Sequence, residues 1–85
     1  MYLAKVYITL KPTVNDPQGL TIKGALHNLG FDTVKSVRYG KYMELQMEGE
    51  DIARAGEQVK EMCRKLLANT VIENFSFELE EMKIT

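Results

Sequence analysis

The chain has one cysteine, one histidine and no tryptophan among its 85 residues. A single cysteine cannot form an internal disulfide, so the fold must depend on packing alone. Cys63 lies on an apolar helical stripe between Met62 and Leu66, which predicts a small buried side chain and not a reactive thiol. His27 has no second histidine or cysteine with which to share a metal. We interpret it as a polar residue on a helix face.

Long hydrophobic runs are also absent. No segment approaches the roughly eighteen apolar residues that a membrane-spanning helix requires, and residues 1–5 lack the pattern of a secretory signal. Eleven basic and twelve acidic residues are interspersed and give a formal net charge of -1. This balance provides no broad field that would attract nucleic acid or an anionic membrane. We therefore expect a cytoplasmic protein that binds neither.

The first half of the chain predicts one strand and one helix. Every second residue from Tyr2 to Leu10 is apolar, with Lys5 and Thr9 among the residues between them, which is the period of a half-buried strand. Asp16 is placed to cap a helix that begins at Pro17 and reaches about Leu29, and Gly30 then supplies a left-handed C-terminal residue. The apolar stripe of this helix consists of Ile22, Ala25, Leu26 and Leu29.

The middle segment keeps one apolar phase on both sides of Gly40. The residues that share this phase are Val37, Tyr39, Met43, Leu45 and Met47. A two-residue hairpin at residues 40–41 would break the phase, whereas a three-residue loop or a strand bent at Gly40 preserves it. We favour one long bent strand, which divides the chain into two βαβ halves.

The second half again predicts a helix followed by a strand. Asp51 caps the helix, and Asn69 is expected to end it in a left-handed conformation. We expect Glu80 to Thr85 to form a fraying tail. The helix stripe contains Ile52, Ala55, Val59, Met62, Cys63 and Leu66, and the last strand alternates at Val71, Phe75, Phe77 and Leu79.

These elements predict a single domain, residues 1–85, of the α+β class. We expect a two-layer sandwich in which an antiparallel sheet carries two helices on one face, in βαβ-βαβ order with the long bent strand in the middle. A βαββαβ ferredoxin-like order is the alternative. A domain of this length buries a small core, so self-association is expected to help stabilise it.

Motifs of catalytic and phosphate-binding sites are missing. The turn at residues 15–19 has one glycine, and Pro17 lacks an N–H group, so it predicts a helix start and not a phosphate loop. Glu78, Glu80 and Glu81 lie near the end of the last strand, where carboxylates are usually solvated and not an acid/base pair. We predict no catalytic residue, no cofactor and no metal ligand in this chain.

Two segments are candidates for a partner interface. Arginine and tyrosine are enriched at interface hot spots, and the segment around Gly40 concentrates them; the turn after the second helix is the other candidate. The candidate residues are Arg38, Tyr39, Lys41, Tyr42, Asn69 and Thr70. The simpler interpretations are solvated strand residues in the first segment and a helix cap in the second.

Two ungapped stretches, Val37–Glu44 and Met62–Glu73, resemble one known family, together with the strand Val6–Lys11 and the turn Asp16–Gly19. This is the PurS family, the small S subunit of bacterial and archaeal phosphoribosylformylglycinamidine synthase. That enzyme is an ATP-consuming ligase and a glutamine-dependent amidotransferase complex of purine biosynthesis. The resemblance covers nearly the whole chain.

The resemblance implies a subunit without an active site of its own. Such a subunit forms a homo-oligomer, a dimer or tetramer, and bridges the glutaminase subunit and the large synthetase subunit. It helps ammonia from glutamine reach the synthetase site, while ATP, magnesium and glutamine are used by the partner chains. The alternative is a small-molecule-binding regulatory domain with the same element order, since fold alone does not assign function.

Overall fold

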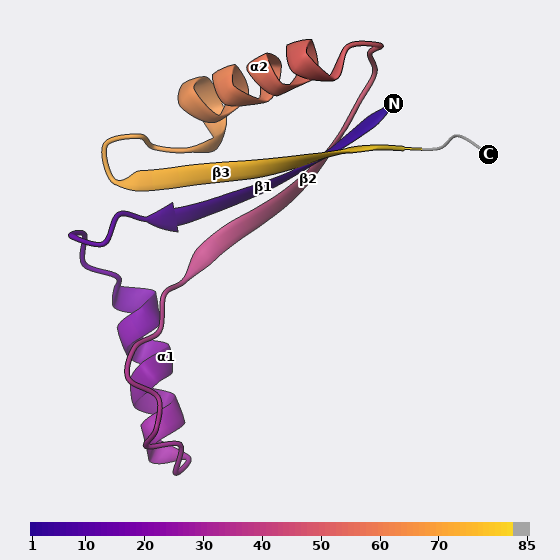
Figure 1. Ribbon diagram of the computed structural model, residues 1–85. Coiled ribbons are helices and arrows are strands. Elements are labelled where there is room, and N and C mark those ends of the chain that lie inside the picture. Colours follow the sequence, from indigo (N-terminus) through magenta and orange to yellow (C-terminus); the bar gives the residue numbers. More distant parts are fainter. Residues whose placement is uncertain (83–85) are drawn as a thin grey trace.

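The computed structural model describes residues 1–82. A three-stranded sheet carries one helix on one face, and a second helix projects away from the sheet (Figure 1). The molecule is accordingly elongated, with principal extents of 50 × 33 × 15 Å. Its elements are β1 (Tyr2–Leu10), α1 (Pro17–Asn28), β2 (Gly40–Met47), α2 (Ile52–Met62), a π-helical turn η1 (Cys63–Leu67) and β3 (Glu73–Glu81).

The sheet has the order β2-β1-β3, and β1 pairs antiparallel with both neighbours. Opposite β2, the register runs from Tyr2 against Met47 to Thr9 against Gly40. The central position of β1 explains its alternating burial, because every second side chain faces α2. The predicted α+β class, the antiparallel sheet and the order of elements are confirmed.

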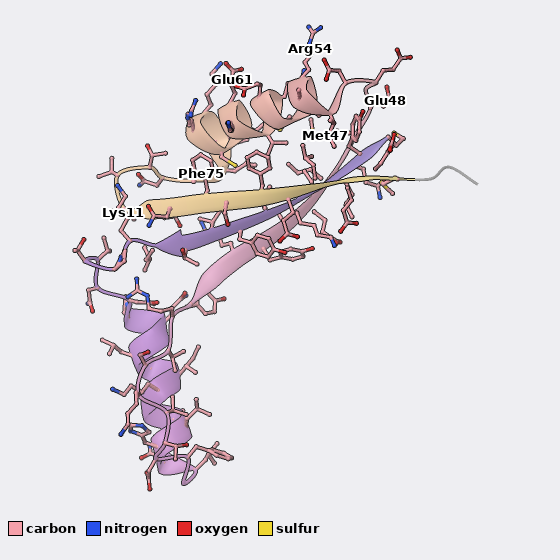
Figure 2. The ribbon with its side chains drawn as sticks, in the orientation of Figure 1. Lys11, Met47, Glu48, Arg54, Glu61 and Phe75 are labelled. Atoms are coloured by element: carbon pink, nitrogen blue, oxygen red, sulfur yellow. The ribbon has the colours of Figure 1, made fainter. Side chains whose placement is uncertain are left out.

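The core lies between the sheet and α2. Val6 and Ile8 of β1 meet Val59 of α2 and Cys63 of η1, and each of these is at most 1% exposed. Met47 and Phe75 pack against this core from the two edge strands (Figure 2). The predicted burial of Cys63 is confirmed, and burial raises the pKa of its thiol. Within residues 1–82, no helix combines the length and apolar character needed to cross a membrane.

α1 does not pack on the sheet, so the expectation of two helices on one face is wrong for this helix. The helix itself is confirmed, with Asp16 as its N-cap and Gly30 at φ +95° after it. Its only buried residue is Gly19, and Leu29 is 73% exposed. The predicted apolar stripe is therefore not buried, and Ile22 within it is 38% exposed. We call residues 11–39 the arm, and the sheet with α2 and η1 the body.

The return segment of the arm runs alongside α1 and is not part of a strand. His27 Nε2 lies 2.8 Å from the carbonyl oxygen of Val34, and the Phe31 amide donates to the Leu26 carbonyl at 3.0 Å. β2 begins only at Gly40, so the long bent strand is wrong for Val37–Tyr39. These contacts hold the return segment against α1. The segment does not form a strand, because no other strand of the arm lies beside it to pair with.

The end of the second helix also differs from its prediction. Leu66 was expected on the buried stripe but is 82% exposed, because the π-helical turn adds a residue and rotates the following side chains. Asn69 is not left-handed, since within residues 1–82 only glycines have positive φ. Val71 precedes β3 and is 78% exposed. Glu80 and Glu81 belong to β3 and not to a tail, and residues 83–85 of the predicted tail lie outside the described residues.

Candidate interface where the arm meets the sheet

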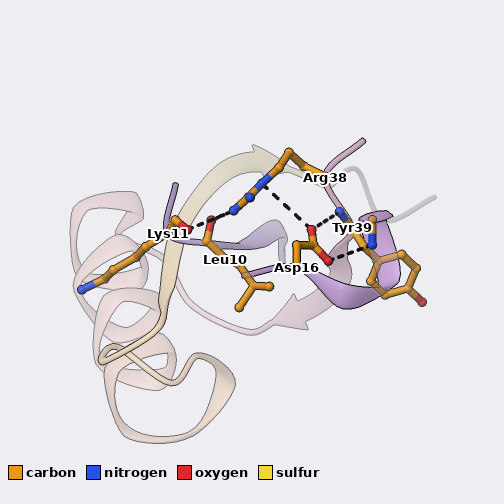
Figure 3. A network of polar contacts seen from close by, with 6 residues as sticks. Leu10, Lys11, Asp16, Arg38 and Tyr39 are labelled. Carbon is orange, nitrogen blue, oxygen red and sulfur yellow. Dashed lines mark hydrogen bonds and ion pairs between the residues drawn. The ribbon is translucent and has the colours of Figure 1, made fainter. Parts of the chain in front are cut away.

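A polar clasp joins the arm to the end of β1. The Arg38 Nη2 group donates to the carbonyl oxygens of Leu10 and Lys11, both at 2.9 Å. The Asp16 carboxylate accepts from two amides, Gly19 N at 2.9 Å and Tyr39 N at 2.8 Å (Figure 3). The Arg38 Nε atom lies 4.0 Å from Asp16 Oδ2. Arg38 therefore serves the fold, although its side chain is still 41% exposed.

The clasp depends on a charged Asp16 and on the absence of a side chain at Gly19. The amides of Tyr39 and Gly19, and then the Arg38 charge, lower the pKa of Asp16 below its ordinary value. A Cβ at position 19 would clash with the carbonyl oxygen of Val37, closer than any packing tolerates. The start of α1 and the end of the return segment can therefore meet only at a glycine.

Glu73 brings the two predicted interface segments together. One carboxylate oxygen lies 3.5 Å from Lys41 Nζ, and the other accepts from the amide of Asn69 at 2.7 Å. Asn69 Oδ1 also accepts from Val71 N at 3.2 Å, so Asn69 organises the turn. Lys41 and Thr70 remain exposed at the same end of the sheet. The helix-cap interpretation of Asn69 is thus replaced by a turn that β3 itself stabilises.

Tyr39 and Tyr42 lie on different sides of the molecule. Tyr39 is 48% exposed and lines an apolar hollow of α1 with Pro17 and Ile22. Tyr42 is 51% exposed, lies against Tyr7 with ring centroids 5.2 Å apart, and donates its hydroxyl proton to Glu44 at 2.9 Å. Partial burial and this hydrogen bond raise the pKa of Tyr42.

The structure therefore gathers five of the six candidate residues around one end of the sheet, namely Arg38, Tyr39, Lys41, Asn69 and Thr70. It places Tyr42 on the face of the sheet opposite α2. Sequence reasoning missed the residues that hold them there, Asp16 as a clasp and Glu73 as a bridge. Asp16 was identified only as a cap, and its second contact spans 23 positions. A contact between residues so far apart in the sequence leaves no local sequence pattern. Within residues 1–82, no three His, Cys, Asp or Glu side chains are grouped as a metal would require.

The fold and these residues define a class of protein: a small α+β domain with a helix-covered sheet and an arm that presents tyrosine, arginine and lysine side chains. The family model PurS, described as phosphoribosylformylglycinamidine (FGAM) synthase, matches residues 3–81. The chain belongs to the PurS family. It is thereby assigned to FGAM synthase of purine biosynthesis as the PurS-type subunit, as the sequence predicted.

Relatives with known sequence or structure agree along almost the whole chain. The FGAM synthase subunit PurS of Bacillus subtilis is 52% identical over 82 residues, which cover 96% of each chain. A crystal structure of PurS from Methanocaldococcus jannaschii has a TM-score of 0.89 at 44% identity, covering 98% of this chain and 100% of that one. A chain of the PurLQS structure from Thermotoga maritima has a TM-score of 0.83 at 31% identity, covering 94% and 99%.

Proposed function

We propose that this chain is a non-catalytic bridge in FGAM synthase. It contacts the glutaminase subunit and the large synthetase subunit and aids the transfer of ammonia between them. ATP, magnesium and glutamine are used by those partner subunits. The similarity to a chain of the PurLQS structure supports assembly with two other proteins. The predicted cytoplasmic location belongs to the same proposal, because a subunit works where its partners and their substrates are.

The observation that carries assembly with other chains, a second copy included, is the exposure of large apolar side chains on the arm. Leu20, Leu29 and Phe31 are between 56% and 73% exposed. A second protein surface that covers these side chains would remove their apolar area from water. The arm projects from a body that has its own core, so a covering partner can bind without disturbing that core (Figure 1).

A homo-oligomer, a dimer or tetramer, is the second part of the proposal. A groove of about 560 Å³ lies between the end of α2 and the edge strand β2, lined in part by Leu45, Met62 and Leu66. This is the face on which the sequence predicted a second helix. We propose that α1 of a second copy occupies this groove, which would cover the apolar side chains of both surfaces.

Reconstitution tests the bridging function. The large synthetase and glutaminase subunits are mixed with and without this chain, and product is measured with glutamine or with ammonium as nitrogen donor. We expect the chain to be required with glutamine and to matter far less with ammonium, because ammonium bypasses the transfer. Equal glutamine-dependent rates with and without the chain would contradict the proposal.

Light scattering over a concentration series tests self-association. The double variant Phe31→Ser, Leu66→Ser alters one exposed residue on the arm and one in the groove, and we expect it to shift the chain toward monomer. Val71→Ser is the matched control, because Val71 is 78% exposed but lies in neither surface. A native chain that stays monomeric at micromolar concentration would refute this part.

A further inference from the structure

The face of the sheet opposite α2 is uncovered in the described part of the chain (Figure 1). We call it the open face. Its side chains follow from the strand register and are Leu3, Lys5, Tyr7 and Thr9 of β1, Tyr42, Glu44 and Gln46 of β2, and Asn74, Ser76, Glu78 and Glu80 of β3.

The open face carries an excess of negative charge. Lys5 is its only cation, and the register places Glu44 and Glu78 on either side of it. The Lys5 ammonium donates a hydrogen bond to Glu80, which raises the pKa of Lys5. The open face therefore carries three carboxylates and one ammonium. Such a surface repels phosphate backbones and attracts cationic groups.

An aromatic pair lies beside these charges. Tyr7 and Tyr42 pack at an interplanar angle of 43° and are 38% and 51% exposed. The hydrogen bond from Tyr42 to Glu44 fixes the outer ring, so little side-chain entropy remains to be lost on binding. Exposed tyrosines are frequent hot spots, and their faces attract arginine and lysine.

We propose that the open face binds a cationic protein surface, rich in arginine and lysine, on one of the other two subunits of FGAM synthase. This inference rests on the proposed bridging function and assigns one of its contacts. The carboxylates supply charge complementarity and orientation, and the tyrosine pair supplies the contact area. The arm and the groove remain available for self-association, because they lie on other parts of the molecule.

Neutralising two carboxylates tests the electrostatic part. The double variant Glu44→Gln, Glu78→Gln leaves the Lys5–Glu80 pair intact, and its control is Glu50→Gln, Glu57→Gln, which removes the same charge from exposed positions outside the open face and the groove. Binding to each purified partner subunit is titrated at low and moderate salt. We expect the dissociation constant for one partner to rise about fivefold or more with the open-face variant and less than twofold with the control. The native complex should also weaken more steeply with salt.

Tyr42→Ala tests the aromatic part without changing charge. We expect about a tenfold loss of affinity for the same partner, with a melting temperature close to that of the native chain, because half of the ring is exposed. This variant keeps the proposal testable if the double variant folds poorly.

The other results overturn the inference. Equal partner affinities for the open-face and control variants would mean that the open face is not a contact. A loss of self-association in light scattering, with partner affinity retained, would mean that a second copy covers the face. Failure of the native chain to bind either subunit would refute the bridging function itself, and that outcome is recognised before any variant is compared.

Discussion

The body and the arm each contain a helix, yet only the body covers the apolar side chains of its helix. Val59 of α2 is 0% exposed, whereas Leu29 at the end of α1 is 73% exposed. Both helices have an aspartate cap, but apolar side chains gather on one side of α2 and are spread around α1. Only α2 lies on a face of the sheet. The exposed apolar side chains of α1 therefore leave open which chain covers them.

The largest expected contrast is in stability. Ile8→Ala in the body should lower the free energy of unfolding by about 3 kcal/mol, because it leaves a cavity under α2. Leu29→Ala in the arm should change it by about 0.5 kcal/mol or less in dilute monomer, because the side chain is exposed. Urea titrations of both variants provide the measurement. Similar losses for the two would mean that the arm is packed as tightly as the body.

Substitutions at two glycines of α1 test how closely the helix approaches the return segment at the clasp. Gly19→Ala should lower the free energy of unfolding by about 2 kcal/mol, because the new Cβ would clash with the Val37 carbonyl oxygen. Gly24→Ala is the matched control; nothing lies within 4 Å of its Cβ, and the helix should gain about 0.5 to 1 kcal/mol. Thermal unfolding distinguishes them by sign. A stabilising change at Gly19 would contradict the close approach at the clasp.

A smaller effect is expected from the charge of Asp16. Asp16→Asn retains a capping side chain but removes the carboxylate that Tyr39, Gly19 and Arg38 stabilise. Because the folded-state pKa of Asp16 is lowered, its charge stabilises the native chain above the unfolded pKa of about 3.9. This stabilisation is lost as the pH falls through the lower folded pKa. The melting temperature of the native chain should exceed that of the variant by a few degrees at pH 7, and the gap should narrow and close as the pH falls below the unfolded pKa of Asp16.

If the native chain and Asp16→Asn had equal melting temperatures at every pH, the carboxylate would not hold the clasp. A gap that widened on acidification would contradict the sign of the pKa shift.

Local patterns were sufficient for much of the fold. Alternation predicted β1, the aspartates predicted both helix starts, and Gly30 predicted the end of α1. The errors arose where contacts between residues distant in the sequence determine the local structure. The clasp keeps residues 37–39 out of a strand, and the π-helical turn moves Leu66 into solvent. Neither the range of the Asp16 contact nor the extra residue of the turn leaves a periodic signal.

The candidate residues show the same division. The composition alone indicated the cluster of tyrosine and basic side chains. These side chains are exposed, and their role in binding a partner stays a prediction. The position at which β2 begins places the side chains of that cluster on two different faces. It also brings Lys41 to Glu73, whose carboxylate accepts a hydrogen bond from the Asn69 amide. The open face could not be assembled from the sequence, because Lys5 meets carboxylates from two other strands only after the register is known.

Amide hydrogen exchange tests the contrast between body and arm most directly. It is measured on the dilute chain and again after assembly with the other two subunits. We expect the β1 amides to be protected in both states, whereas residues 20–36 should exchange faster in the dilute chain, where α1 does not pack on the sheet, and slowly after assembly. Equal protection of the arm in both states, with new protection confined to the exposed side of α2, would contradict the account.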